Sequence, residues 1–208
     1  HNDARRQRQM CIRDSFNDDM FLIKESNPGD WFINNNAVLT GNWAKTYNIQ
    51  PLKKIAKLLK RILKSRPSYN HAQSKAANIV GFDKKYFKSY HSGRPQVKSV
   101  IKNFYDNNPK ILKRQLSYKF RNDKQYMPYS LCWHLLIKAE QYEAANKNRL
   151  IEIEKIRNLG PGKLKKILLD IDHNTKAQFL NVQDLNYASK ETAKVFKDWL
   201  RNKLAGKN

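Results

Sequence analysis

A mainly α-helical fold with two small helical domains is the architecture that this 208-residue sequence predicts. Apolar residues recur with helical spacing in residues 51–64, 97–107 and 189–204, and this periodicity is typical of amphipathic helices. A polar stretch at 122–128 ends in proline and precedes a new apolar run, as expected at a domain boundary. The two expected domains are residues 16–122 and 123–208.

The first domain is expected to open with an irregular lead, residues 16–40, that contains a turn at Asn27-Pro28-Gly29-Asp30. Residues 51–64 then have the clearest helical period, and the polar face of this helix carries six basic residues and no acid: Lys53, Lys54, Lys57, Lys60, Arg61 and Lys64. Such a run is usually a solvated face. Phosphate contact is the interpretation that we favour, with Lys57, Lys60 and Arg61 as contact residues. Later helices are expected at 97–107, 111–120, 129–159 and 189–204.

The beginning of the chain has an artificial character. Residues 5–15, RRQRQMCIRDS, match the translation of a common transposon-type sequencing adapter, so residues 1–15 are expected to be a disordered assembly artefact. The whole chain has a net charge of +23, and removing the four Arg and two Asp of residues 1–15 leaves +21. The basic character therefore belongs to the remaining sequence.

So large a positive charge predicts a polyanion as partner, and nucleic acid is the polyanion that we expect. No run of residues is long and apolar enough for a transmembrane helix, so no membrane partner is expected. Beyond residue 15 the one cysteine is Cys132, which predicts a reducing compartment, the cytoplasm or the nucleoid, and no cysteine-rich zinc site. We expect no cofactor and no bound metal.

The stretch from Gln73 to Pro95 has the spacing of two helices joined by a tight turn. Ala76 and Ala77 are small enough to let a second helix cross closely, and Gly81 can adopt the positive φ of the turn. Asp83 suits the N-cap of the next helix. With Phe82, Phe87 and Tyr90 facing the core, the free face of that helix would carry Lys84, Lys85, Lys88 and Ser89. We therefore expect a recognition helix at residues 84–89.

This segment resembles the lambda-repressor/Cro family of helix-turn-helix proteins over residues 55–107. The matching positions are Gln73, Ala76, Ala77, Gly81, Gly93 and Arg94. The resemblance implies that Gln73 contacts a DNA phosphate at the start of the first helix and that Arg94 belongs to the DNA interface. An ordinary helical hairpin with basic solvent faces is the alternative.

A second turn lies in residues 156–167, IRNLGPGKLKKI. A helix is expected to stop at Gly160, turn through Gly162 and restart with Leu164 and Ile167 facing inward. The alternative without a binding role is a plain corner between two helices, in which Gly160 ends the first helix.

The same residues resemble the helix-hairpin-helix in the C-terminal domain of the bacterial RNA polymerase alpha subunit, over residues 150–171. The matching positions are Asn158, Leu159, Gly160, Leu164 and Ile167. In such hairpins the backbone N–H groups of a glycine-rich turn approach phosphate. The resemblance implies this role for Gly160 and Gly162, reinforced by Lys163.

Asp172-His173-Asn174, followed by Asn181 and Asp184-Leu185, resembles the pattern of HNH nucleases. The resemblance implies nuclease chemistry, and a polar loop is the alternative. Trp133 and His134 are expected in the core or in an interface, because a lone histidine is weak evidence for catalysis.

Together these features predict a sequence-preferring duplex-DNA-binding protein, either a transcription regulator or a replication or recombination accessory factor, that needs no catalytic residue. Its basic faces would capture DNA and the 84–89 helix would enter the major groove. An RNA-binding or ribosome-associated protein and an HNH-like nuclease are the alternatives. The last helix, 189–204, would pack the second domain or form a homodimer. The expected DNA-contacting residues are Lys57, Lys60, Arg61, Gln73, Lys84, Lys85, Lys88, Ser89, Arg94, Gly160, Gly162 and Lys163.

Overall fold

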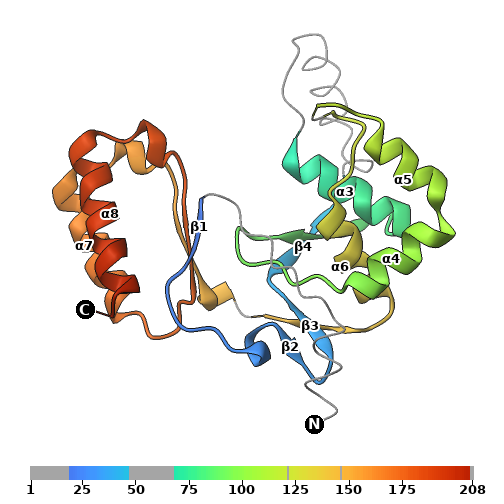
Figure 1. Ribbon diagram of the computed structural model, residues 1–208, viewed down its shortest axis with the longest axis horizontal. Coiled ribbons are helices and arrows are strands. Elements are labelled where there is room, and N and C mark those ends of the chain that lie inside the picture. The colour runs from blue at the N-terminus through green and yellow to red at the C-terminus, as the bar shows by residue number, and fades with distance from the viewer. Residues whose placement is uncertain (1–18, 47–67, 121, 146, 207–208) are drawn as a thin grey trace. The chain divides into compact units, whose positions relative to one another are not determined.

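The structure, a computed structural model, describes residues 19–46, 68–120, 122–145 and 147–206. These residues form six α-helices and eight strands, which are arranged in three small sheets (Figure 1). The fold is therefore mixed α/β, and the expectation of a mainly α-helical protein is wrong. The strands are only two to five residues long, so their alternation does not stand out against the helical stripes.

The described residues divide into two compact units. The first comprises the described parts of residues 31–90 and 94–144, and the second those of residues 15–30, 91–93 and 145–208. The boundary expected at 122–128 lies inside the first unit, because α6 (Pro128–Lys138) follows it and packs against α3 (Tyr69–Val80). Each unit thus draws on distant parts of the chain.

The first unit contains two sheets. β2 (Phe32–Ile33) and β3 (Asn36–Leu39) form a hairpin, and β3 also pairs in parallel with β6 (Tyr142–Ala144). The hairpin turn consists of Asn34 and Asn35, with φ of 50° and 67°, the left-handed conformation that two-residue hairpin turns need and that asparagine tolerates. The lead expected to be irregular is therefore partly strand, although its predicted turn is present as the 3-10 helix η1 (Pro28–Asp30).

The second sheet of this unit is a two-stranded ribbon of β4 (Gly41–Lys45) and β5 (Lys85–Ser89). At Gly41 the backbone of β5 comes so close that an added Cβ would lie 2.4 Å from the carbonyl oxygen of Lys88. Only glycine fits at this position without a shift of the ribbon.

Four helices complete the first unit: α3, α4 (Lys98–Asn107), α5 (Pro109–Leu116) and α6. α3 ends at Gly81, which has φ of 100°, as predicted. Ala76 is fully buried beside Leu131, so the helix that crosses the small residues of α3 is α6. The helix predicted at 97–107 is confirmed, whereas the one predicted at 111–120 ends at Leu116.

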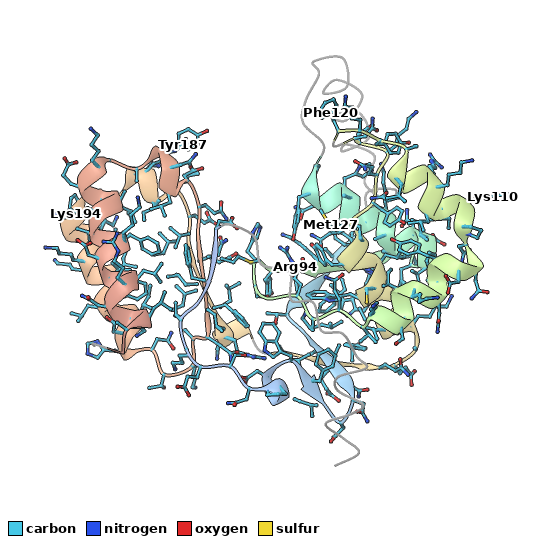
Figure 2. The ribbon with its side chains drawn as sticks, in the orientation of Figure 1. Arg94, Lys110, Phe120, Met127, Tyr187 and Lys194 are labelled. Atoms are coloured by element: carbon cyan, nitrogen blue, oxygen red, sulfur yellow. The ribbon has the colours of Figure 1, made fainter. Side chains whose placement is uncertain are left out.

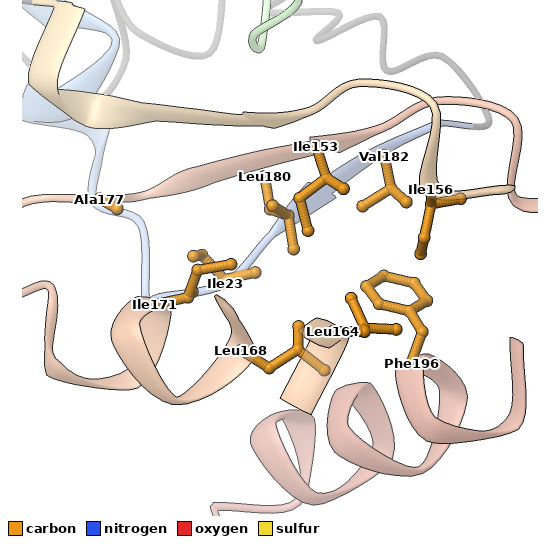
Figure 3. Packing of buried hydrophobic residues seen from close by; sticks show 10 residues of the cluster. All are labelled: Ile23, Ile153, Ile156, Leu164, Leu168, Ile171, Ala177, Leu180, Val182 and Phe196. Carbon is orange, nitrogen blue, oxygen red and sulfur yellow. The ribbon is translucent and has the colours of Figure 1, made fainter. Parts of the chain in front are cut away.

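The second unit is a three-stranded sheet with two helices. The strand order is β1 (Met20–Leu22), β8 (Phe179–Val182), β7 (Leu150–Ile153), and β7 and β8 are parallel. α7 (Pro161–His173) and α8 (Lys190–Leu204) pack on one face of this sheet (Figure 1). Figure 3 shows Leu164 and Leu168 of α7 and Phe196 of α8 directed at Ile153 and Leu180 of the strands. The predicted last helix is confirmed, and its apolar face packs within this unit.

The second unit contains an internal repeat. β7, the 3-10 helix η4 (Ile156–Asn158) and α7 are followed by β8, η5 (Leu185–Tyr187) and α8 in the same order. The register pairs Leu150 with Phe179, so the copies are 29 residues apart. In each copy a non-glycine residue with positive φ precedes the 3-10 helix, Lys155 at 55° and Asp184 at 64°.

Candidate nucleic-acid interface

Residues 85–89 form β5, so the recognition helix expected at residues 84–89 is absent and that prediction is wrong. Ser89 is buried, and its backbone N–H donates to Gln73 Oε1 at 2.9 Å. The N–H of Phe87 donates to His134 Nε2, also at 2.9 Å. Pairing with β4 and these two contacts with α3 and α6 select the strand, and adjacent aromatic residues at 86 and 87 also favour it.

Two further residues expected at DNA are buried inside the first unit: Gln73 is 0% exposed and Arg94 is 2% exposed. Arg94 Nη2 donates to Tyr69 Oη at 2.8 Å, and its guanidinium carbon lies 4.4 Å from the centroid of the Tyr129 ring. A buried guanidinium is stabilised by such hydrogen bonding and cation–π contact. The predicted DNA contacts of Gln73, Ser89 and Arg94 are therefore corrected to contacts that hold the unit together.

Lys84 and Lys85, in contrast, are exposed, and they line an open depression of about 560 Å³. Its other lining residues are Trp43, Gly81, Phe82 and Asp83. We call this the Trp43 surface. Lys88 is half-buried and lies on the other side of the ribbon, because side chains alternate along a strand. Two of the predicted contact residues, Lys84 and Lys85, thus lie beside Trp43, a residue that local spacing in the sequence does not connect with them.

Trp43 is held in a fixed position although it is 42% exposed. Its ring is nearly perpendicular to that of Phe87, with centroids 5.7 Å apart, and its centroid lies 5.9 Å from that of Phe82. The end of β4 is tied to the turn before β5, since Thr46 N donates to the carbonyl oxygen of Lys84 at 3.1 Å. The aromatic and basic walls of the depression therefore belong to one hydrogen-bonded framework.

A second basic surface runs along α8 in the second unit. Lys190, Lys194, Lys197 and Arg201 are exposed, and they share one face because they are spaced by four, three and four residues. We call them the α8 stripe. They line an open depression of about 440 Å³ together with Leu185, Asn186, Ala188, Ala193 and Asp198. Asp198 is paired with Arg201, with 3.1 Å between Oδ1 and Nη1.

An exposed aromatic residue lies just before the stripe: Tyr187, at the end of η5, is 68% exposed. Figure 2 shows Tyr187 at the tip of the second unit and Lys194 projecting from α8. The spacing of four, three and four residues between these basic side chains is a signal for this surface that the sequence contains. Interpretation of residues 189–204 by their apolar face alone does not reveal it.

The helix-hairpin-helix expected at 150–171 is not formed, because the segment before the turn is β7 and η4 instead of a helix. Gly160 is the N-cap of α7 with φ of −79°, and Gly162 lies in the first turn. An added Cβ would meet nothing within 4 Å at either glycine. These glycines are therefore not required by a close approach or by backbone strain. Lys163 is exposed on α7.

The residues that resemble the HNH pattern do not form a cluster. Asp172 accepts hydrogen bonds from Trp199 Nε1 at 2.9 Å and from Lys203 Nζ at 2.6 Å. Asn181 is buried in β8, and Asp184 pairs with Arg157 at 3.2 Å. Across the described ranges of the chain, no group of three His, Cys, Asp or Glu side chains is arranged to hold a metal ion.

Trp133 and His134 are both fully buried in α6, which confirms the expectation of core residues. Lys57, Lys60 and Arg61 lie outside the described residues, as does the adapter-like start of the chain. Two large apolar side chains of the first unit are exposed, Leu116 at 72% and Phe120 at 78%. Phe120 lies at an outer end of the first unit in Figure 2, with Lys119 Nζ 5.7 Å from its ring centroid.

Comparison with known proteins gives no family for this chain: no protein-family model matches it, and no curated protein is similar enough to count as a relative. Among the described residues, no helix is both long and apolar enough to cross a bilayer.

Proposed function

We propose that this protein binds nucleic acid and that the α8 stripe holds the sugar–phosphate backbone of duplex DNA. The observation that carries the proposal is the alignment of four exposed cations on one face of one helix, with Asp198 as the one acid among the residues that line the same depression. Backbone contacts of this kind give affinity and position without reading bases.

The length of the α8 stripe suits a phosphate chain. From Lys190 to Arg201 a helix rises about 16 Å, at about 1.5 Å per residue. Duplex DNA carries roughly one negative charge per 1.7 Å of axis, so several phosphates lie within reach of the four side chains. The excess of 41 basic over 18 acidic residues draws the whole chain to such a polymer.

The expected recognition helix plays no part in this proposal, since its residues form β5. We therefore propose that the α8 stripe binds the backbone alone, without preference for a base sequence. The proposal involves no catalytic step. The buried, free thiol of Cys132 fits a reducing compartment such as the cytoplasm, which we propose as the location.

The test is neutralisation of the stripe in Lys194→Gln/Lys197→Gln, with binding to a labelled duplex measured over a series of salt concentrations. Loss of two phosphate contacts should reduce the magnitude of the negative slope of log K against log salt by about 1.8. The matched control is Lys110→Gln/Lys113→Gln on α5, which removes the same charge from exposed lysines of the first unit.

Equal effects of the two double variants would refute the α8 stripe as the contact and leave only general attraction by net charge. Tighter binding to a structured RNA than to DNA, lost in the same α8 variant, would move the proposal to the RNA-binding alternative.

A further inference from the structure

We propose that the Trp43 surface binds an unpaired nucleobase, so that the first unit recognises single-stranded nucleic acid. This inference concerns a different unit from the α8 stripe and does not depend on it. Trp43 keeps 42% of its surface exposed although it packs against the rings of Phe82 and Phe87. An exposed aromatic ring held in place is the kind of platform on which bases of single strands stack.

The charges around the ring favour a base carried by a phosphate chain. Lys84 and Lys85 line the depression with Trp43, and Lys45 pairs with Lys85 in the strand register. Trp43, Lys45 and Lys85 share one side of the ribbon because they are separated by two residues or are direct cross-strand neighbours. Asp83 is the one acid in the lining. Stacking and phosphate attraction thus meet within one depression.

A cationic guest is the competing occupant, since Trp43, Phe82 and Asp83 together resemble the walls of an aromatic cage. The two lysines of the lining, Lys84 and Lys85, repel a cation, so the aromatic lining is better matched to a neutral ring. The volume of about 560 Å³ also falls in the range of small-molecule sites. An intact duplex cannot use the ring, because its bases are already stacked on each other.

The experiment compares the full chain with Trp43→Ala and Trp43→Phe in binding a labelled oligothymidylate of twelve nucleotides and a duplex of the same length. Trp43→Ala should weaken oligothymidylate binding about 10-fold, because stacking contributes about 1–3 kcal/mol per base. Trp43→Phe should retain most of the affinity. Duplex binding should change less than twofold in both variants.

The control is Ile33→Ala, which removes an apolar side chain of similar exposure, 45%, from β2 of the same unit. It should leave oligothymidylate binding unchanged. Circular dichroism establishes that each variant is folded. In the wild-type protein, oligothymidylate should quench tryptophan emission, and this quenching should be absent in Trp43→Phe.

The lysines provide an independent arm. In Lys84→Gln/Lys85→Gln, the negative slope of log K against log salt for oligothymidylate binding should decrease in magnitude by about 1.4, the value for two contacts to a single strand. Unchanged oligothymidylate affinity in folded Trp43→Ala would overturn the proposal, and so would equal quenching by polyglutamate, which would identify an acidic peptide surface. If the α8 variants lose duplex binding but keep oligothymidylate binding, the α8 stripe is supported as the duplex contact and the Trp43 surface is supported as a separate site.

Discussion

His134 is a buried histidine whose surroundings lower its pKa, an effect that can be measured through the pH dependence of stability. It is fully buried, Nε2 accepts from the N–H of Phe87 at 2.9 Å, and Nδ1 lies 2.6 Å from the carbonyl oxygen of Ser130. A carbonyl oxygen can only accept, so Nδ1 carries the proton and the neutral ring satisfies both contacts. Burial lowers the pKa of His134 to about 4.

The first unit should therefore lose stability in mild acid. The unfolded chain takes up a proton near the ordinary histidine pKa of about 6.5, whereas the folded side chain resists until about pH 4. The stabilisation is complete above pH 6.5 and is lost as the pH falls toward 4, by about 3 kcal/mol in total. Urea unfolding followed by circular dichroism at a series of pH values measures this change.

His134→Gln is the comparison, because glutamine does not titrate in this range. Its unfolding free energy should vary less between pH 7 and pH 4.5 than that of the wild-type protein. Parallel curves for the two proteins would show that other groups, and not His134, cause the acid sensitivity.

Arg94 shows why single residues are hard to assign from sequence. A basic residue after a glycine looks like a surface contact, yet the guanidinium is enclosed by Tyr69 and Tyr129, residues that are distant in the chain. Gln73 is similar, since its partner is a backbone N–H of β5. Side chains of this kind acquire their partners only when the fold is complete, and local spacing holds no information about them.

At the scale of elements, several helices and helix ends were readable because their signals are local. The helix expected at 129–159, however, ends at Lys138 and is followed by β6 and β7. Gly81 at the end of α3, Ser189 at the start of α8 and the period of α4 follow from neighbouring residues. The strands were missed because each is short and most are selected by a distant partner, as β4 is by β5. The asparagine pair at 34 and 35 is a local hairpin signal in the sequence, since both residues adopt the positive φ of a two-residue turn.

The candidate site was predictable in part for the same reason. Lys84 and Lys85 were identified and are exposed, but their neighbour Trp43 comes from a strand about forty residues earlier and reaches them only through the ribbon register. The α8 stripe needed no tertiary information, since its spacing is helical.

Two glycines should respond to the same substitution with opposite sign. Gly41→Ala places a Cβ 2.4 Å from a backbone oxygen of β5, so the free energy of unfolding should fall by about 2 kcal/mol. Gly162→Ala meets nothing within 4 Å in the first turn of α7 and should stabilise the second unit by up to about 1 kcal/mol, because alanine favours helix. Thermal melting of the two variants measures both effects.

Destabilisation by Gly162→Ala would show that this turn is constrained in a way that the open space around it does not indicate. A neutral Gly41→Ala would mean that the ribbon shifts without cost.

At the scale of the whole molecule, the excess of positive charge predicts a polyanion as the class of partner, but it does not indicate where contact occurs. Exposed lysines occur on α4, α5, α7, α8 and the ribbon. Net charge is a property of composition and acts at long range, whereas a binding surface needs cations held on one face.

The α8 stripe has a consequence for how firmly the second unit holds together. Neighbouring members of the stripe repel one another on the helix surface: Lys190 and Lys194, Lys194 and Lys197, and Lys197 and Arg201. Among the described residues, the ion pair formed by the stripe is that of Arg201 with Asp198. Lys197→Glu would turn two of these repulsions into attractions. It should raise the free energy of unfolding by about 1 kcal/mol, and with it the melting temperature, while weakening duplex binding. Conversely, a bound polyanion should raise the melting temperature of the wild-type protein more than that of this variant, a difference that differential scanning calorimetry with and without duplex would measure. A variant that melts at a lower temperature, or that DNA stabilises as strongly as the wild type, would contradict the idea that the stripe lowers stability in favour of DNA binding.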